Sequence, residues 1–228
     1  MKQNKILDII INLLNGIKND NQLLEKTDEN RTMYLVGCSY LLNQTIRQYQ
    51  IPKSHYFISE KAFELWNKLS TDDMLKYSYR DKVVKNTEDE VVIDKYKGSE
   101  KTPFKKSLPI KKGEGFIYND VFTDEHIVTV SNIIDELLDL PTYDYLAITK
   151  ILDKIYICKM LKSEDHIIKN RSNRSTDYRE VIIRDYQEVG IKVKNFDYRM
   201  ELKNLITKYQ LALEELERSE EVSVQKYT

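Results

Sequence analysis

The 228-residue chain is poor in cysteine: it has only Cys38 and Cys158, which lie far apart in the sequence. Two distant cysteines exclude a disulfide framework, and the lack of any CxxC pair excludes a structural zinc site built from such pairs. We therefore expect no structural zinc and a reduced, cytoplasmic setting. The 6 glycines and 4 prolines are too few for a collagen-like or linker-dominated chain.

The chain also lacks a long hydrophobic run. No segment approaches the roughly 18 apolar residues that a membrane-spanning helix needs, so we expect no membrane partner. Asp8 and Asn12 interrupt the apolar run at residues 6–14, and no small-residue cleavage site follows it. We interpret this run as a buried helix and not as a signal peptide.

The chain also lacks an excess of charge of either sign. The 36 Lys and Arg residues nearly balance the 37 Asp and Glu residues, which gives a formal net charge of −1. The charge of the whole chain therefore indicates no nucleic-acid partner, and any such signal must be local. Hydrophobic residues make up 41% of the chain, which is compatible with a buried core and incompatible with a disordered protein.

The distribution of apolar residues predicts an α+β fold. Residues 1–80 form a helical N-terminal region, because their apolar residues recur at helical spacing and Ser59 is a typical helix N-cap. Beyond residue 80, β-branched runs such as 91–93 and 154–158 predict strands. Residues 81–228 then form a second domain that ends in a long helix from residue 195 to about residue 219.

The final predicted helix carries an apolar stripe. Its members are Leu202, Leu205, Ile206, Tyr209, Leu213 and Leu216. The stripe is shorter than the three or four heptads that indicate a coiled coil. We favour packing of this helix on the body of the domain, and a homodimer through the helix is the alternative.

Lysines are concentrated in one segment. Residues 95–112 hold seven lysines and a single acid, Glu100. Pro103 and Pro109 lie in the same region, so we expect residues 98–115 to be irregular. The segment is either a solvated loop or an arm that contacts phosphates, because clustered lysines release counterions from a polyanion. The candidate phosphate contacts are Lys105, Lys106, Lys111 and Lys112.

The chemically informative pair is Glu125-His126, at the apparent end of a strand. Neighbouring residues of a regular strand point to opposite faces, but at a strand end both side chains can converge. A carboxylate binds hard divalent cations such as Mg²⁺ or Mn²⁺, and a neutral imidazole can take a proton from water. The pair suits metal-assisted phosphodiester hydrolysis; a surface histidine at a strand end is the alternative.

The sequence downstream of this pair has a recognisable order. A helical stretch, a strand at 154–158 and a helix opened by Ser163 follow Glu125-His126. In residues 121–128, 151–165 and 171–175, and in Tyr186 and Gly190-Ile191 further on, the chain resembles the HNH endonuclease superfamily. The resemblance spans about residues 113–193.

This resemblance implies a ββα-metal core with a helical insertion. It implies that Glu125 is a metal ligand and that His126 is the general base. The third catalytic position falls among Glu164, Asp165 and His166, and the residues do not decide which of them binds the metal. The resemblance also implies a DNA substrate and a restriction or phage-defence role.

Arginines that follow this helix are candidate DNA contacts, because a guanidinium binds phosphate with two parallel hydrogen bonds. We expect Arg171 and Arg174 to serve in this way. Two other interpretations stay open: a non-enzymatic nucleic-acid or protein-interaction module on a degenerate nuclease fold, and an unrelated α+β domain in which Glu125-His126 is coincidental.

Overall fold

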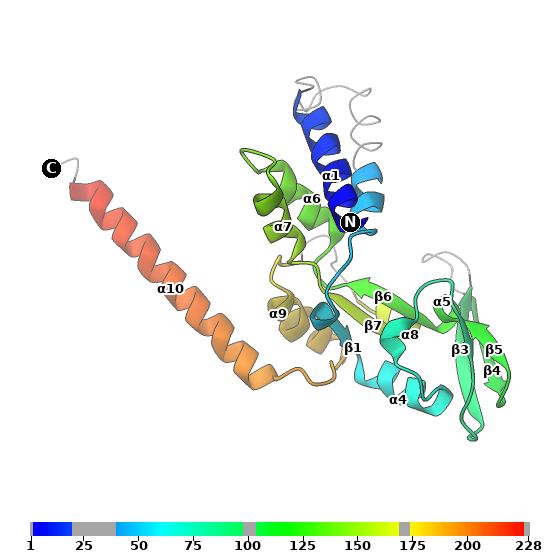
Figure 1. Cartoon of the computed structure of the whole chain (residues 1–228). Helices are drawn as coiled ribbons and strands as arrows, with labels where there is room; N and C mark the ends of the chain where they lie inside the picture. Colours follow the sequence, from blue (N-terminus) through cyan, green and yellow to red (C-terminus); the bar gives the residue numbers. More distant parts are fainter. Residues whose placement is uncertain (1, 20–39, 98–103, 169–173, 226–228) are drawn as a thin grey trace.

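The computed structural model describes residues 2–19, 40–97, 104–168 and 174–225. Its fold is α+β with a long C-terminal helix, which confirms the predicted class (Figure 1). The α-helices are α1 (Lys2–Asn19), α4 (Glu60–Leu69), α5 (Tyr118–Val121), α6 (Val130–Leu138), α7 (Tyr145–Leu152), α8 (Lys162–Asp165), α9 (Tyr178–Val181) and α10 (Tyr198–Gln225). Shorter turns are η1 (Lys53–His55), η2 (Met74–Lys76) and the π-helical η4 (Ile182–Tyr186). Residues 40–46 are helical too.

Three strands form the central sheet, in the order β1 (Tyr56–Ile58), β7 (Ile157–Leu161) and β6 (Phe122–His126). The middle strand β7 runs parallel to β1 and antiparallel to β6. In the β6–β7 register, Glu125 lies opposite Cys158. β7 is almost wholly buried, in agreement with its apolar sequence.

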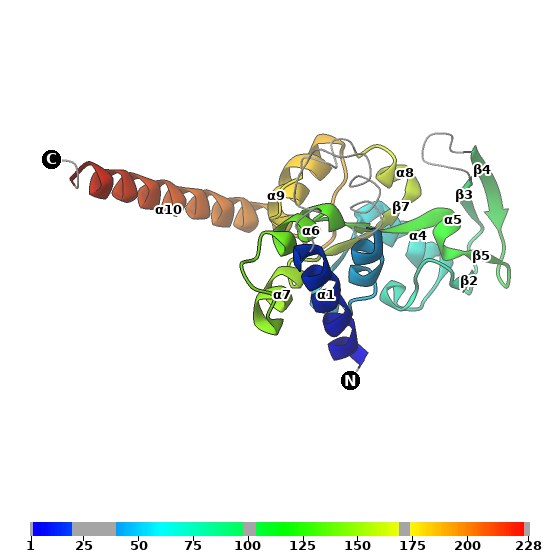
Figure 2. The same cartoon turned by 90° about the horizontal axis from the view of Figure 1, so that it is seen from above.

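Two smaller antiparallel sheets complete the strand content. One pairs β2 (Lys82–Val84) with β5 (Gly115–Ile117), and the other is a ribbon of β3 (Val91–Lys97) and β4 (Phe104–Ile110). The ribbon lies at the side of the molecule away from α10 (Figure 2). The expectation that residues 98–115 are irregular is wrong for β4, because Pro109 is tolerated in a strand that has only one partner.

The buried core divides into three clusters. The first packs α1 and helical residues 40–46 against α6 and α7. The second lies between α4, the ribbon and β5, with Trp66 and Phe122 among its members. The third lies between the central sheet and the segment formed by α9 and η4. Packing crosses the expected boundary at residue 80, since β1 pairs with β7. The division into 1–80 and 81–228 stays a prediction.

Helix starts follow local capping chemistry. Ser59 caps α4 as expected, because its side chain accepts a hydrogen bond from the Ala62 amide. Thr129 caps α6 and Asp144 caps α7, each accepting from the backbone amide three residues on. Several adjacent residues in each region could cap a helix, so composition alone leaves its start uncertain by a few residues.

The C-terminal helix α10 extends away from the body of the molecule (Figures 1 and 2). Its first three turns are held to α9 by polar contacts: Arg179 Nε lies 2.7 Å from Glu201 Oε2, and the Tyr209 hydroxyl donates to Glu180 at 2.6 Å. Of the predicted apolar stripe only Leu205 is buried. The expectation that the stripe packs on the body is therefore wrong for most of its members, although Tyr209 contacts α9 through its hydroxyl. Among the described residues, no helix has the length and apolar character needed to cross a membrane.

Candidate functional site

The candidate site is built on two paired strands and the short helix after them, and α6 and α7 separate the two strands along the chain. Glu125 and His126 close β6, β7 pairs antiparallel with β6, and α8 follows β7 directly. The two residues point to opposite faces of the sheet, as neighbours on a regular strand do. Glu125 faces the segment formed by α9 and η4, whereas His126 lies beside Arg47 on the other face.

The carboxylate of Glu125 is engaged by a buried arginine. Arg174 Nη1 lies 2.6 Å from Glu125 Oε1 and also donates to the backbone oxygen of His126 at 3.1 Å. Asp185 approaches the same guanidinium from η4, with Oδ2 4.0 Å from Nε. Two carboxylates from separate elements therefore converge on one cationic group.

Several buried polar atoms around Arg174 form no hydrogen bond with the described residues. Arg174 Nη2, Asp185 Oδ2 and the Tyr186 hydroxyl are buried without a hydrogen-bond partner in the described part of the chain. Burial, the first cause, raises the pKa of Tyr186, and nearby Cys158 and Glu125 add to the effect. Buried polar atoms without partners are uncommon in folded proteins and are concentrated at functional sites and water sites.

His126 is held in its neutral form. Burial, with a smaller contribution from the positive charge of Arg47, lowers the pKa of His126 to about 3. The imidazole Nδ1 lies 3.4 Å from Arg47 Nη1. Because an arginine can only donate, this contact places the ring lone pair on Nδ1 and the proton on Nε2. A neutral imidazole with a lone pair at physiological pH has the protonation state that a general base requires.

The three candidate ligands of α8 point in different directions. Glu164 is buried and accepts hydrogen bonds from Ser59 Oγ at 2.5 Å and from the Leu161 amide at 3.0 Å. Burial raises the pKa of Glu164, although both hydrogen bonds oppose that shift. His166 makes an edge contact with Tyr96 of the ribbon, with 5.1 Å between ring centroids. Asp165 lies near enough to Tyr186 for its charge to contribute to the raised pKa of that tyrosine, after burial and the charges of Cys158 and Glu125.

The chemistry of these donors suits a hard cation, but a guanidinium stands among them. Carboxylate oxygens are the preferred ligands of Mg²⁺ and Mn²⁺. The Arg174 guanidinium takes the position between Glu125 and Asp185. No three His, Cys, Asp or Glu side chains within residues 2–19, 40–97, 104–168 and 174–225 are grouped so that they could hold a metal. The expected divalent cation therefore stays a prediction.

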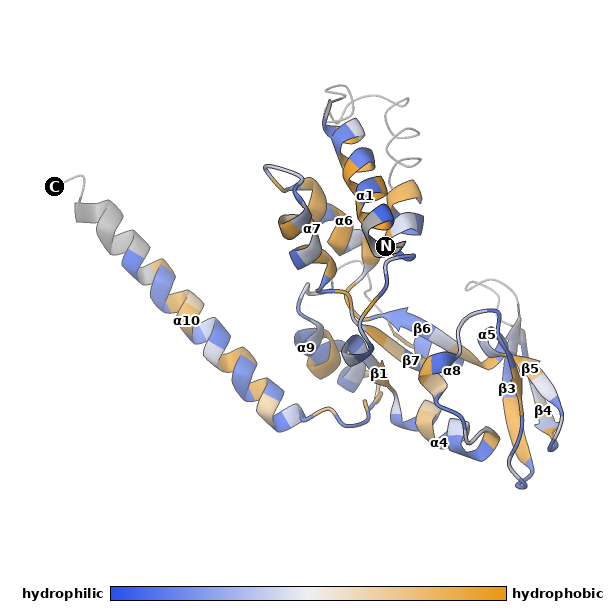
Figure 3. Ribbon diagram, in the orientation of Figure 1, coloured by the Kyte–Doolittle hydropathy of each residue, from blue (hydrophilic) through white to orange (hydrophobic). Residues whose placement is uncertain are grey.

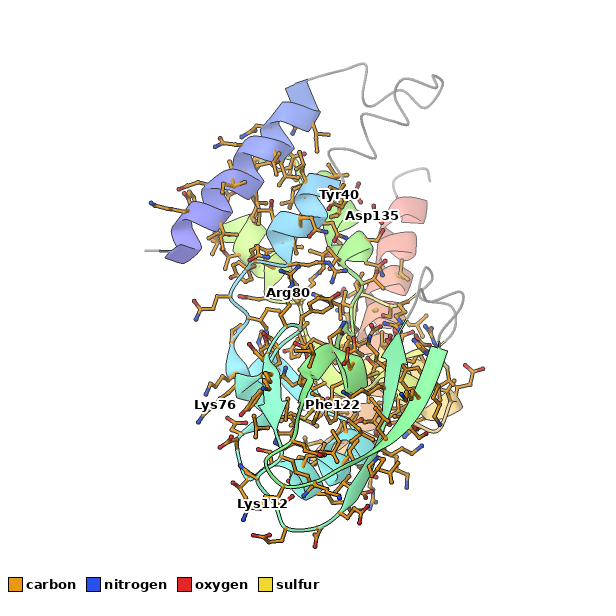
Figure 4. All side chains as sticks on the ribbon, turned by 90° about the vertical axis from the view of Figure 1, so that its right-hand side faces the viewer. Tyr40, Lys76, Arg80, Lys112, Phe122 and Asp135 are labelled. Carbon is orange, nitrogen blue, oxygen red and sulfur yellow. The ribbon has the colours of Figure 1, made fainter. Side chains whose placement is uncertain are left out.

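The candidate DNA contacts differ in their availability. Lys105 is paired with Asp94 at 2.8 Å, and Lys112 with Glu88. Lys106 and Lys111 form no side-chain ion pair with any described residue. Lys112 lies at the opposite end of the molecule from Tyr40 (Figure 4).

Of the two candidate arginines, the structure describes only Arg174. Arg171 lies outside the described residues. The side chain of Arg174 is fully buried, because it binds Glu125 within the third core cluster. Arg174 therefore binds Glu125 in this structure, and its contact with the DNA backbone stays a prediction.

Sequence reasoning missed Asp185 and a second polar cluster below the sheet. Lys159 is 1% exposed, and its ammonium group donates to Asp124 Oδ1 at 2.8 Å and to the Tyr77 backbone oxygen at 2.7 Å. The sequence does contain a signal for this cluster: Lys159 lies within an otherwise apolar strand. A lysine that is buried with its strand needs polar partners. Nothing in the sequence marks Asp185 among the many acids on predicted helices.

Comparisons with protein-family models, curated proteins and solved structures find no match.

Proposed function

We propose that this chain is a metal-dependent DNA endonuclease of the HNH type, which hydrolyses phosphodiester bonds. The observation that best supports the proposal is the strand–strand–helix order of β6, β7 and α8, with an acid–histidine pair at the end of the first strand. This order is what the sequence resemblance implies for the core of such an enzyme. A restriction or phage-defence role would follow from the same activity.

In this proposal His126 is the general base. Its neutral imidazole carries a lone pair on Nδ1, and the low pKa keeps it unprotonated throughout the physiological range. The low pKa also makes it a weaker base, so the attacking water must itself be acidified. A bound divalent cation would supply that acidification and would stabilise charge on the phosphate. Because Glu125 and His126 point to opposite faces of the sheet and Nδ1 accepts from Arg47, the proposal requires that the end of β6 turns both side chains toward one site and that Arg47 releases the imidazole.

Glu125 and Asp185 are proposed to hold the cation, with Asp165 as a third ligand that would have to move toward them, because no three such side chains in the described part of the chain are grouped to hold a metal. All three supply carboxylate oxygens, and Glu125 and Asp185 already face a shared positive charge. Cation binding requires that the Arg174 guanidinium leaves the space between them, because two positive charges at one position repel each other. The same displacement would free Arg174 to contact a phosphate.

The lysines of the ribbon are proposed to bind the DNA backbone. Lys95 and Lys106 lie directly opposite each other across β3 and β4. Like charges in directly opposed positions destabilise a strand pair, and a phosphate between them would relieve that repulsion. Lys95 is partly compensated by Asp120 at 3.9 Å, which leaves Lys106 as the stronger candidate.

A non-enzymatic binding module on a degenerate nuclease fold is the second candidate. The buried ion pair of Glu125 with Arg174 favours it, since the carboxylate is already neutralised without a metal. This candidate predicts DNA or protein binding that persists without cleavage and does not respond to divalent cations.

A plasmid assay separates the two candidates. The full chain is incubated with supercoiled plasmid in Mg²⁺ or Mn²⁺, with and without EDTA. The nuclease proposal predicts nicking that EDTA abolishes and that His126→Ala slows by about 10²–10⁴-fold, the usual contribution of a positioned base. His55→Ala is the matched control, because His55 has no role in the proposed site and its ring stacks on Tyr156. Retained cleavage by folded His126→Ala protein would reject His126 as the base, and DNA binding without nicking in either metal would support the second candidate.

A further inference from the structure

The helix α10 has an apolar face that is largely exposed, although the hydroxyl of Tyr209 on this face donates to Glu180 of α9. Leu202, Ile206, Tyr209, Leu213 and Leu216 are 47%, 50%, 47%, 59% and 59% exposed. The hydropathy colouring shows apolar positions recurring along the part of α10 that extends beyond the body (Figure 3). Exposing five large apolar side chains in one row is costly in water and is typical of an interaction surface.

The spacing of these residues defines a coiled-coil seam. Successive members are separated by four, three, four and three residues, which is the alternation of a and d positions in a heptad repeat. The seam lies beside the face that contacts α9, where Leu205 is buried. Leu211 is 55% exposed but lies on the opposite side of the helix from the seam.

Charge is distributed unevenly along the same helix. Residues 198–209 carry Arg199, Lys203 and Lys208 with one acid, Glu201; Glu201 is paired with Arg179 and Lys208 with Asp177. Residues 210–225 carry five glutamates and a single arginine, Arg218. The helix is therefore positive in its first half and strongly negative in its second half.

We propose that the apolar face of α10 binds α10 of a second copy of this chain, and that the two helices run antiparallel. An antiparallel pair places the positive half of each helix beside the negative half of the other, whereas a parallel pair places like charges together. The apolar row is nearly symmetric about Tyr209, so Leu202 and Ile206 of one copy meet Leu213 and Leu216 of the other. Such a contact is isologous and closes as a dimer.

The antiparallel arrangement predicts a specific pair of charged positions. Positions 203 and 217 are two heptads apart and lie on the same flank of the seam. A two-fold axis near residue 210 brings Lys203 of one copy next to Glu217 of the other, twice in the dimer. In a parallel pair, position 203 instead faces the partner's position 198, five residues earlier, which is a tyrosine.

The first experiment measures association of the full chain by analytical ultracentrifugation. The seam is short, so a concentration series from about 1 to 200 µM is appropriate to a dimer of modest affinity. Ile206→Glu should raise the dissociation constant by about 100-fold, because it places two carboxylates in an apolar contact. Leu211→Glu is the matched control and should leave the constant within about twofold. A chain that stays monomeric at every concentration, or equal effects of the two variants, would overturn the proposal.

The second experiment tests the direction of the helices. Lys203→Glu and Glu217→Lys should each weaken the dimer by about fivefold, and the double variant should restore it, since exposed ion pairs contribute modestly. Additive weakening in the double variant would reject the antiparallel arrangement. Circular dichroism of each variant confirms that α10 remains helical. The outcome is independent of whether the chain cleaves DNA.

Discussion

Arg174 and Glu125 form a buried ion pair at the centre of the candidate site, with Nη1 2.6 Å from Oε1. The arginine side chain is fully buried and the glutamate side chain is 12% exposed, so water screens the pair very little. Two further hydrogen bonds, to the backbone oxygens of His126 and Ile127, fix the guanidinium at the end of β6. The same residue thus stabilises the fold and occupies the place where a catalytic cation would bind.

Arg174→Met should be strongly destabilising. Removing one partner of a buried ion pair leaves the other charge buried without compensation, which costs about 3–5 kcal/mol. Urea denaturation of the variant and the parent chain measures this difference. Arg184→Met is the control: Arg184 is 50% exposed and pairs with Glu180 and Asp185, so its removal should cost less than about 1 kcal/mol. Equal losses in the two variants would contradict the structural role assigned to Arg174.

The Arg174→Met variant should also gain a response to Mn²⁺. Without the guanidinium, Glu125 and Asp185 face each other as two carboxylates, and a divalent cation relieves their repulsion. At a hundredfold excess over Kd, a ligand stabilises the folded state by about 2.7 kcal/mol, which corresponds to a rise in Tm of roughly 5–10 °C for a chain of this size. Differential scanning fluorimetry measures this shift.

Two comparisons make the Mn²⁺ test specific. Adding Asp185→Asn to the variant should abolish most of the stabilisation, because one ligand is lost. The parent chain should respond less than Arg174→Met, since its guanidinium competes with the ion. If Mn²⁺ shifts all three proteins equally, these carboxylates are not its site.

The sequence predicts local elements better than it predicts the candidate site. The strands at 91–93 and near 157 and the Ser59 cap follow from β-branched runs and capping chemistry, both of which act over a few residues. The strand β1 is missed because three residues give no periodic signal, and only pairing with β7 stabilises them. The ion pair of Arg174 with Glu125 joins residues 49 positions apart, a contact that composition and spacing cannot encode.

The lysines of the ribbon should differ in their contribution to DNA binding. Lys106→Ala should make the slope of log K against log salt shallower by about 0.9, the value for one lost phosphate contact. Lys105→Ala is the neighbouring control, because Lys105 is already paired with Asp94 and the change should be smaller. Fluorescence anisotropy with labelled duplex DNA at several salt concentrations measures both slopes. A binding constant that does not depend on salt would indicate a protein partner instead.

The low pKa of His126 predicts how stability changes with pH. The pKa is about 3 in the folded chain, whereas an unperturbed histidine titrates near 6.5. Between these values the unfolded chain binds a proton that the folded chain does not, so the free energy of unfolding falls as the pH is lowered below 6.5. His126→Gln removes this pH-dependent contribution to the free energy of unfolding. The parent chain loses stability between pH 7.5 and pH 5 and the variant does not, so the difference in stability between them should shrink by up to about 2 kcal/mol. Urea denaturation of both proteins at the two pH values measures the change. A difference that stays constant between them would mean that His126 takes up its proton as readily in the folded chain as in the unfolded one.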